Sequence, residues 1–242
     1  NMIKTILFDL DGTLLPMDQD VFTKSYFRQL IKKIAPLGYD PEILVDTIWK
    51  GTKAMVENDG TRTNEEAFWD CFVERFGENA KKDIPVFEEF YRKEFQEVEK
   101  DCGKNPMAKK TVKWIKEKGF QVALATNPIF PSIATESRIR WAGLEPEDFS
   151  IYTTYENSIH SKPNPEYYRD IVKQLNCKAE ECMMIGNDVE EDMIAKTLGM
   201  KVFLLTDCII NRNNKDIAEY PHGSFQDLMD YINHMDEEFC DK

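Results

Sequence analysis

Two aspartates close an apolar run near the start of the chain, within the stretch ILFDLDGTLLP. Asp9 and Asp11 stand two positions apart, and Gly12 follows them where the chain can turn without a Cβ in the way. Carboxylates this close repel each other, although Asp-x-Asp-Gly is also a favourable turn sequence. If other polar residues join the pair, a cation or a substrate that offsets the repulsion explains it better than a turn alone.

Polar residues follow two later apolar runs in the same way. Thr126 and Asn127 come directly after VALA, and Gly186, Asn187 and Asp188 come directly after CMMI. In open α/β sheets, ligands bind outside the carboxyl ends of the strands. The sequence therefore predicts that three strands bring carboxylates, a hydroxyl and amides to one edge of a sheet.

The apolar runs that precede these residues predict the sheet itself. They span residues 3–8, 120–125, 182–185 and 201–205, and each is nearly continuous, which is typical of strands covered on both faces. Residues 150–156 are a weaker candidate. Helical patterns separate the later runs, so we expect an α/β fold with right-handed βαβ units: a Rossmann-like open parallel sheet with helices on both faces.

The segment between the first strand and about Lys104 contains no comparable strand run. Its periodicity is helical throughout, and Asn64 is a good candidate for the N-cap of the third helix. We therefore expect a small all-α domain, residues 17–103, inserted after the first strand into an α/β core formed by residues 1–16 and 104–242. The helices expected in the insertion span residues 20–37, 41–58, 64–76 and 85–98.

Four short motifs occur along the chain in a characteristic order. They are DLDGT (9–13), TN (126–127), SKPNPEYY (161–168) and GNDVEED (186–192). In this order they resemble the four motifs of the haloacid dehalogenase-like hydrolase superfamily in its phosphatase-type form, and the helical insertion resembles that family's type 1 cap. The resemblance covers nearly the whole chain. It implies a Mg²⁺-dependent phosphatase that acts on a small phosphorylated metabolite through an aspartyl-phosphate intermediate.

The resemblance also implies a role for each matching residue. Asp9 is expected to attack phosphorus and bind the metal, and Asp11 to protonate the leaving oxygen and then take a proton from water. The backbone carbonyl of Asp11 is a further expected metal ligand, and Lys162 is expected to supply fixed positive charge beside Asp9. Mg²⁺ prefers oxygen ligands and neutralises both carboxylate and phosphate. Gly12, Thr126, Asn127 and Lys162 are expected to hold the phosphoryl oxygens, and Thr13 and Asp192 to support the site.

The fourth motif departs from the family's usual pattern, which places an aspartate directly after the glycine. Asn187 stands at that metal-binding position, Asp192 stands at the later acidic position, and Asp188 stands where a serine is common. Either Asn187 binds the metal through its amide oxygen or Asp188 supplies a carboxylate. Because a divalent ion favours charged oxygen, we favour Asp188.

Other activities on the same core remain open. A dehalogenase needs no metal and no second acid, so Asp11 argues against that activity. A phosphonate hydrolase needs a cap lysine, for which Lys50 and Lys53 are candidates, and a sugar phosphomutase would use the same core residues. A non-enzymatic, inert relative that binds phospho-ligands is also possible, because Asn187 is one missing carboxylate. Phospho-accepting receiver domains are about half this length and lack the helical insertion.

Two other kinds of residue near the motifs are expected to have structural roles only. Glu191 is interpreted as a charge at a helix N-terminus. Trp49 and the other tryptophans are expected in packing rather than in substrate stacking. Lys50 and Lys53 could reach a substrate anion from the insertion, but solvated surface positions are favoured for both.

The bulk composition limits the classes of partner. The 242 residues include 31 Lys and Arg against 44 Asp and Glu, a formal charge of −13, which argues against nucleic acid or an anionic membrane surface as the main partner. No apolar run approaches the roughly 18–20 residues that span a bilayer. The six cysteines show no CxxC spacing and the three histidines do not pair at ligand spacing, so we expect free thiols in a reducing cytoplasm and no zinc site. Neither the substrate nor the oligomeric state follows from the sequence.

Overall fold

The computed structural model describes residues 2–240, with side chains described as far as residue 235. At its centre, the strands form a five-stranded sheet in which all neighbours run parallel, in the order β2-β1-β3-β4-β5. The strands are β1 (Thr5–Phe8), β2 (Gln121–Leu124), β3 (Cys182–Gly186), β4 (Lys201–Leu205) and β5 (His222–Gly223). The four strongest apolar runs are thus confirmed as strands, and the short β5 was not predicted.

The weaker strand candidate at residues 150–156 is only partly correct. Residues 150–153 lie along the edge of β2, where the backbone N–H groups of Ser150 and Thr153 donate to the carbonyl oxygens of Val122 and Leu124 at 2.9 and 3.2 Å. Tyr152 forms a single bridge with Leu124 at the edge of β2, and the chain then leaves the sheet. The hydroxyl of Thr153 donates to the carbonyl oxygen of Thr126 at 2.6 Å, so the rest of the segment follows the loop after β2 and forms no strand.

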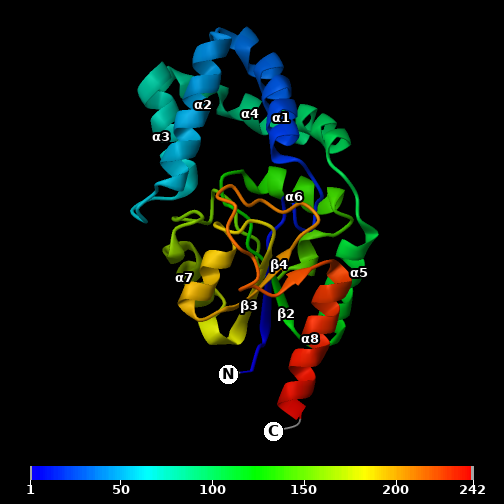
Figure 1. Cartoon of the computed structure of the whole chain (residues 1–242). Helices are drawn as coiled ribbons and strands as arrows, with labels where there is room; N and C mark the ends of the chain where they lie inside the picture. Colours follow the sequence, from blue (N-terminus) through cyan, green and yellow to red (C-terminus); the bar gives the residue numbers. More distant parts are fainter. Residues whose placement is uncertain (1, 241–242) are drawn as a thin grey trace.

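Helices cover both faces of the sheet. They are α5 (Pro106–Glu117), α6 (Ser132–Trp141), α7 (Pro165–Gln174) and α8 (Phe225–Cys240), with 3₁₀ segments η4 (Pro146–Asp148), η5 (Ala179–Glu181) and η6 (Met193–Leu198). Along β1, Ile6 and Phe8 pack in one apolar cluster with α5, α6 and α8, whereas Leu7 packs in a second cluster with α7 and η6. Figure 1 shows α5 and α8 on one side of the sheet and α7 on the other. The predicted fold class is confirmed.

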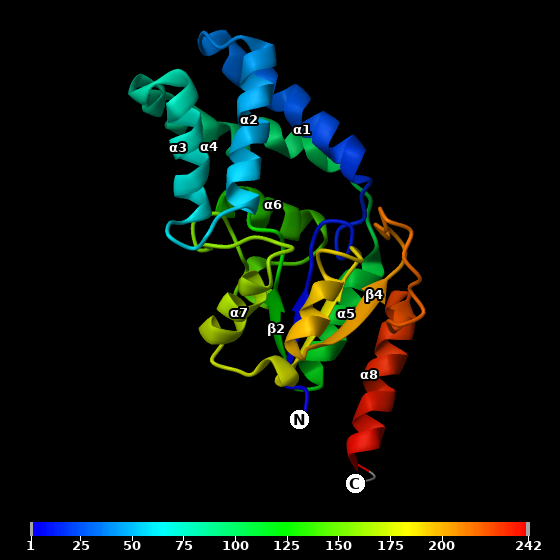
Figure 2. The ribbon, with the colours of Figure 1, turned by 60° about the vertical axis from the view of Figure 1, so that its left-hand side comes forward.

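A block of helices between β1 and α5 forms a separate layer, which we call the cap. It contains α1 (Gln19–Ile34), α2 (Pro41–Val56), α3 (Asn64–Phe76) and α4 (Ile84–Arg92), with 3₁₀ segments η1 (Ala35–Leu37), η2 (Glu78–Asp83) and η3 (Glu94–Asp101). Figures 1 and 2 show the cap above the carboxyl ends of the strands, at the opposite end of the molecule from both termini. The all-α insertion after the first strand is confirmed, and its bounds at residues 17 and 103 stay a prediction.

Aromatic rings build the interior of the cap and continue into the core. The ring of Tyr26 lies 6.0 Å from those of Phe90 and Phe95, and Phe95 stacks on Trp141 of α6 at 5.0 Å. The fourth helix predicted for residues 85–98 is only partly correct. Lys93 leaves the helical region at φ −114° and ψ −82°, so α4 ends before it and Phe95 lies in the 3₁₀ segment beyond.

The N-cap predicted at Asn64 is also wrong by one residue. Thr63 caps α3 in a reciprocal capping box with Glu66, and Asn64 is the first helical residue. Asn64 is fully buried, and its side-chain amide donates to the carbonyl oxygen of Pro128 at 2.9 Å and to the Ser161 hydroxyl at 3.0 Å. The side chain is therefore used to join the cap to the core, which leaves the capping to Thr63.

The chain passes between core and cap at two adjacent points. The backbone N–H of Gly103 donates to the carbonyl oxygen of Pro16 at 2.7 Å, so the segment that enters the cap and the segment that leaves it lie side by side. A Cβ on Gly103 would lie 2.9 Å from the Pro16 side chain, which explains the glycine there. The Asn64 contacts lie in a different part of the boundary, so the cap is held to the core at more than one place.

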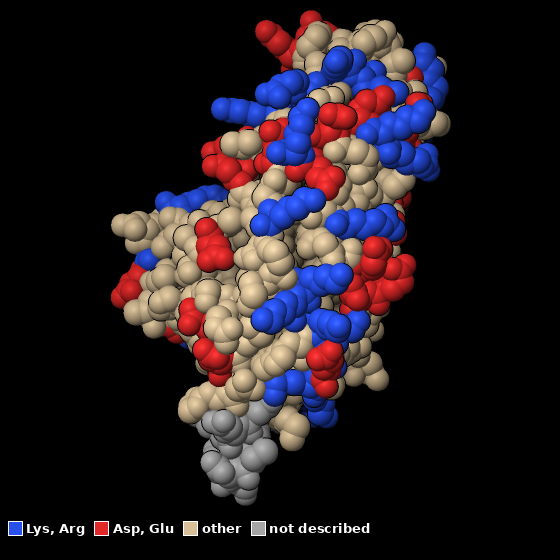
Figure 3. All heavy atoms as spheres, turned by 90° about the vertical axis from the view of Figure 1, so that its right-hand side faces the viewer, with Lys and Arg blue, Asp and Glu red and all other residues tan. Residues whose placement is uncertain are grey.

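The surface carries charges of both signs. On the face shown in Figure 3, Lys and Arg side chains lie interspersed with Asp and Glu. Within residues 2–240, no helix combines the length and the apolar character that crossing a membrane requires.

Candidate active site

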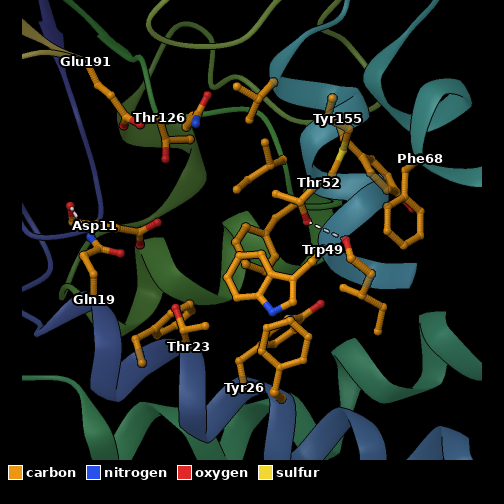
Figure 4. A pocket seen from close by; sticks show the side chains of 18 of the residues that line it. Asp11, Gln19, Thr23, Tyr26, Trp49, Thr52, Phe68, Thr126, Tyr155 and Glu191 are labelled. Atoms are coloured by element: carbon orange, nitrogen blue, oxygen red, sulfur yellow. Dashed lines mark hydrogen bonds between the residues drawn. The ribbon is translucent and has the colours of Figure 1, made fainter. Parts of the chain in front are cut away.

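A cavity of about 400 Å³ lies between the cap and the carboxyl ends of the strands. Its sheet end is polar and includes Asp9, Asp11, Thr126, Asn127 and Asp188, whereas its cap end is lined mainly by aromatic and aliphatic side chains. Figure 4 shows Asp11, Thr126 and Glu191 at one end, and Trp49 and Phe68 toward the other. The predicted meeting of three strand ends therefore takes place at one cavity.

Asp9 follows β1 and is only 7% exposed. One carboxylate oxygen accepts a hydrogen bond from Lys162 Nζ at 2.9 Å, and the other accepts from Thr13 Oγ1 at 3.1 Å. Burial raises the pKa of the Asp9 carboxyl, Lys162 lowers it and the charge of Asp11 raises it, with a net rise. Lys162 thus opposes the effect of burial and favours the carboxylate form of Asp9 in a site that water barely reaches.

Lys162 is buried between two carboxylates. Its ammonium donates to Asp9 at 2.9 Å and to Asp192 at 2.6 Å. Burial alone would lower the pKa of Lys162, but the negative charges of Asp192 and Asp9 outweigh it and raise that pKa well above its usual value. The side chain of Asn127 accepts from the backbone N–H of Lys162 at 3.0 Å, so the second motif positions the third.

Asp192 ties Lys162 to the loop after β3. Its second carboxylate oxygen accepts from the backbone N–H groups of Asn187 and Asp188 at 3.1 and 2.9 Å. Burial raises the pKa of the Asp192 carboxyl, Asp9 raises it further and Lys162 lowers it. A Cβ on Gly186 would lie 2.2 Å from that oxygen, so glycine is needed for this close approach.

Asn187 lies against the turn after β1. Gly12 has φ +83°, and a Cβ there would lie 2.2 Å from Asn187 Nδ2. The amide nitrogen donates to the carbonyl oxygen of Cys208 at 2.9 Å, and the amide oxygen accepts from Thr13 Oγ1 at 3.1 Å. Thr13 thus links Asn187 to Asp9, and the oxygen of Asn187 faces the side of the site where Asp9 lies.

Asp188 is 4% exposed, and both of its oxygens have protein donors. One oxygen accepts from the backbone N–H groups of Glu190 and Glu191 at 2.9 and 3.0 Å. The other accepts from Arg212 Nη1 at 2.9 Å. Arg212, which sequence reasoning missed, lies in the segment between β4 and β5; its position beyond the end of a strand is a signal that could have indicated it.

Asp11 is paired with an arginine that the sequence did not suggest. Arg138 of α6 is fully buried, donates to Asp11 Oδ2 at 2.5 Å and lies 4.5 Å above the ring of Phe130. The other oxygen, Asp11 Oδ1, is buried and has no hydrogen-bond partner among the described residues. Gln19 donates to the backbone carbonyl oxygen of Asp11 at 3.3 Å.

Glu191, which was expected only as a charge at a helix N-terminus, also belongs to the site. It lines the cavity beside Asp188, and burial followed by the charge of Asp188 raises its pKa to about 7. Trp49 also lines the cavity, and its ring packs 5.1 Å from that of Phe27. Lys50 and Lys53 do not line it: they are exposed and pair with Asp46 and Glu57.

The oxygen donors at the sheet end suit a hard cation. Carboxylate, amide and carbonyl oxygens of Asp9, Asp11, Asn187 and Asp188 belong to this end of the site, and Asp11 Oδ1 is a buried oxygen without a donor. No group of three or more His, Cys, Asp or Glu side chains in the described part of the chain could hold a metal by itself. Because the donors at this end are oxygens, they fit Mg²⁺, which takes one or two carboxylates together with water and phosphate oxygens, better than zinc, which favours nitrogen and sulfur ligands.

Comparison with known families agrees with this geometry. A family model described as a haloacid dehalogenase-like hydrolase matches residues 3–199. The chain belongs to the haloacid dehalogenase-like hydrolase family. The predicted resemblance to a phosphatase-type member with a helical cap is confirmed, and the protein is an enzyme of the hydrolase class.

Two relatives of known name match nearly the whole chain. A glyceraldehyde 3-phosphate phosphatase of Methanocaldococcus jannaschii is 26% identical over 238 residues, which are 97% of this chain and 99% of the relative. The pyrophosphatase PpaX of Halalkalibacterium halodurans is 24% identical over 233 residues, which are 95% of this chain and 97% of the relative.

Solved structures share the fold at lower identity. A 2-haloacid dehalogenase from Pseudomonas syringae has a TM-score of 0.62 and 18% identity, covering 96% of this chain and 99% of its own. The hydrolase YfnB of Bacillus subtilis, solved bound to magnesium, has a TM-score of 0.57 and 18% identity, covering 96% and 100%. Likeness at this level shows the fold alone, so substrate and metal have to be argued from the residues of this chain.

Proposed function

We propose that the protein is a Mg²⁺-dependent phosphatase of a small phosphorylated metabolite, with Asp9 as the nucleophile. One observation carries the proposal: a nearly buried carboxylate at the end of β1 lies at the polar end of a cavity, held by the ammonium of Lys162 at 2.9 Å. The names of the two relatives, both enzymes that hydrolyse phosphate compounds, support the same class of reaction.

In the first step, an oxygen of Asp9 forms a bond to phosphorus and the bond from phosphorus to the leaving oxygen breaks. A protonated Asp11 gives its proton to that leaving oxygen, so a neutral alcohol departs and Asp9 carries the phosphoryl group. The position of Asp11, which lines the same cavity and acts electrostatically on Asp9, supports this role.

In the second step, water attacks the aspartyl-phosphate. Asp11 takes a proton from the water, the bond from Asp9 to phosphorus breaks and inorganic phosphate leaves. The first step leaves Asp11 as a carboxylate, which is the form that accepts this proton, and Arg138 donates to its Oδ2 at 2.5 Å. Arg138 is therefore proposed to position Asp11 from the far side of the cavity wall.

Thr126, Asn127 and the backbone at Gly12 are proposed to hold the phosphoryl oxygens, together with the charge of Lys162. The proposed holders of the metal are Asp9, the backbone carbonyl of Asp11 and either Asp188 or Asn187. A bound Mg²⁺ supplies positive charge that lets a carboxylate approach a phosphate dianion. Asp188 is available to the ion only when Arg212 releases it, whereas the Asn187 oxygen already faces the Asp9 side.

One observation bears on the alternatives. Neither Lys50 nor Lys53 lines the cavity, which disfavours a phosphonate hydrolase that needs a cap lysine. A sugar phosphomutase would use the same polar residues, and analysis of the product separates it from a phosphatase.

We also propose a reducing cytoplasm as the compartment, because the described cysteines are free and the thiols of Cys177 and Cys182 lie 3.5 Å apart without a bond.

The direct test is the release of inorganic phosphate from 4-nitrophenyl phosphate by the purified full chain, with and without Mg²⁺. We expect slow turnover that disappears with EDTA and returns when Mg²⁺ is added. Turnover unaffected by EDTA would contradict the metal dependence. Uniform inactivity against this probe and a panel of phosphorylated metabolites would favour the inert relative or a mutase.

A further inference from the structure

The cap end of the cavity is strongly apolar. Trp49 and Phe68 project into it from α2 and α3 (Figure 4). The apolar lining at this end includes Phe22, Phe27, Trp49, Phe68, Trp69 and Phe130. The whole cavity has a volume of about 400 Å³, which is within the usual range for small-molecule sites. The part of a substrate that lies beyond the phosphate would therefore contact rings rather than polar groups.

Trp49 is the most telling member of this lining. Its side chain is 50% exposed although it faces the cavity, and its ring lies 5.1 Å from that of Phe27 with an interplanar angle of 36°. An indole left half-exposed keeps apolar area in contact with water, and a flat apolar ligand group placed on it would remove that area. Trp49 thus offers an unoccupied stacking surface inside the site.

Charge in the cavity points away from a second anionic group on the substrate. Among the described lining residues, Arg212 is the one Lys or Arg, and it already pairs with Asp188. Acidic lining residues outnumber it; they are Asp9, Asp11, Asp20, Asp188 and Glu191. A carboxylate or second phosphate placed toward the cap would lie among apolar rings and would meet no Lys or Arg of the described lining that could pair with it.

The tyrosines at the cap end are neutral. Tyr26 and Tyr91 hydrogen-bond to each other through their hydroxyls at 2.7 Å. Burial raises the pKa of Tyr26 to about 12, so it carries no charge at neutral pH. The hydroxyls of Thr23 and Thr52 also line the cavity as neutral groups, and Thr52 donates to the carbonyl oxygen of Ile48 at 2.9 Å.

We propose that the preferred substrates are phosphate monoesters of neutral alcohols with a flat, apolar ring that covers Trp49. Esters that carry a carboxylate or a second phosphate are disfavoured. This inference rests on the proposed function, because it assigns the leaving group of the same reaction. It separates the protein from relatives whose names describe small, charged or strongly polar substrates.

Three matched substrates test the proposal: benzyl phosphate, ethyl phosphate and 2-phosphoglycolate. All three are esters of primary alcohols, so they differ chiefly in what lies beyond the reacting oxygen. We expect kcat/KM for benzyl phosphate to exceed that for ethyl phosphate by about tenfold or more, from burial of the ring, and 2-phosphoglycolate to be the poorest. Faster turnover of 2-phosphoglycolate or inorganic pyrophosphate than of benzyl phosphate would overturn the proposal.

A pair of tryptophan variants tests the role of the stacking surface. In Trp49→Ala, we expect kcat/KM to fall about five- to tenfold more for benzyl phosphate than for ethyl phosphate. Trp114→Ala is the matched control, because Trp114 lies on α5 outside the cavity lining and contacts Lys118. The control should leave the ratio of the two substrates unchanged. An unchanged ratio in Trp49→Ala as well would contradict the assignment of Trp49.

Binding measurements separate failure of this inference from failure of the proposed function. Calorimetry in the presence of Mg²⁺ compares benzylphosphonate with phosphonoacetate, which are not hydrolysed as esters. Tighter binding of benzylphosphonate without any ester hydrolysis would refute the phosphatase and keep the apolar site. Hydrolysis of simple esters together with tighter binding of phosphonoacetate would keep the phosphatase and refute the apolar site.

Discussion

Lys162 lies behind Asp9 at the sheet end of the cavity, Trp49 lines the cap end, and the two side chains are held in opposite ways. The ammonium of Lys162 is 1% exposed and fixed between two carboxylates, whereas the indole of Trp49 is half-exposed and packs on Phe27. At the sheet end, directional hydrogen bonds fix the orientation of the polar side chains of Asp9, Lys162 and Asp192. At the cap end, rings pack without such directional demands. The sheet end is therefore suited to one reaction, and the cap end can change its preferred leaving group without disturbing that reaction.

The origin of the two ends in the sequence differs in the same way. The sheet end collects residues from three strand ends and the loops that follow them, which lie far apart along the chain. The cap end comes mostly from helices within one continuous insertion. Substitutions at the sheet end should therefore lower turnover of every substrate alike, and substitutions at the cap end should change the ranking of substrates.

The largest effect is expected for Asp9→Asn. Loss of the nucleophile should lower kcat/KM by about a thousandfold or more for apolar and charged esters alike, because the step is common to both. Phosphate release by purified variant and wild type measures the change. Asp230→Asn on the exposed face of α8 is the matched control and should leave activity unchanged. Wild-type activity in Asp9→Asn would refute the nucleophile assignment.

The second effect concerns the ion pair of Asp11 with the buried Arg138, at the sheet end of the cavity. Arg138→Met leaves the carboxylate of Asp11 without its partner, and we expect the free energy of unfolding to fall by about 3–5 kcal/mol. Urea unfolding measures it. Arg140→Met, on the same helix but exposed and paired with Glu145 at 3.4 Å, should change the free energy by about 0.5 kcal/mol or less.

A double variant sharpens this result. Adding Asp11→Asn to Arg138→Met removes the uncompensated charge, so part of the lost stability should return. The loss of unfolding free energy in the double variant, relative to wild type, could instead equal the sum of the losses in Arg138→Met and Asp11→Asn. In that case the ion pair would not be the cause of the loss.

The pairs formed by Arg138 and Arg212 show what the sequence could and could not indicate. The rule that ligands bind beyond strand ends brought Asp9, Asp11 and Asp188 to one cavity without any structure. Lys162 could be assigned only through the order of the motifs, because a single lysine carries no pattern. Arg138, the partner of Asp11, lies 127 positions away on α6. Its burial results from tertiary packing, which the local sequence does not indicate.

The errors in the cap have a similar cause. Helical periodicity located the four helices, and the third was correct in both bounds. Periodicity distinguishes buried from exposed faces but cannot tell a packed ring from one that also faces a cavity, so it did not show that Trp49 lines the cavity. Thr63 and Asn64 are both good capping residues by type. Contacts with distant core loops decide between them, and a local pattern does not contain those contacts.

The third effect distinguishes the two candidate metal ligands after β3. If Asp188 binds the ion, Asp188→Asn should weaken Mg²⁺ binding by about tenfold or more, because a charged ligand is lost. Arg212→Met should strengthen binding, because it frees an oxygen that now accepts from Arg212. Calorimetric titration of Mg²⁺ measures both. Unchanged affinity in Asp188→Asn, with tighter binding in Asn187→Asp, would assign the ligand to Asn187 instead.

The fourth effect tests the connection between the two ends. Asn64→Ala removes an amide that bonds to Pro128 and Ser161, which are the neighbours of Asn127 and Lys162 along the chain. Buried polar partners are left unsatisfied, so we expect a loss of about 1–3 kcal/mol in unfolding free energy. We also expect lower kcat/KM for every substrate, because the loops that position the sheet end lose a contact with the cap.

The smallest effect comes from the adjacent residue and separates docking of the cap from its own stability. Thr63→Ala removes the cap of α3 and should cost about 1 kcal/mol in unfolding free energy, since Thr63 bonds only within its own turn through Glu66. The side-chain hydrogen bonds of Thr63 stay within its own turn, so kcat/KM should stay at the wild-type value while Asn64→Ala lowers it. If both variants lost activity in proportion to their lost stability, general loosening of the cap would explain the loss. A fall confined to Asn64→Ala would show that this amide transmits the position of the cap to the residues that hold phosphate.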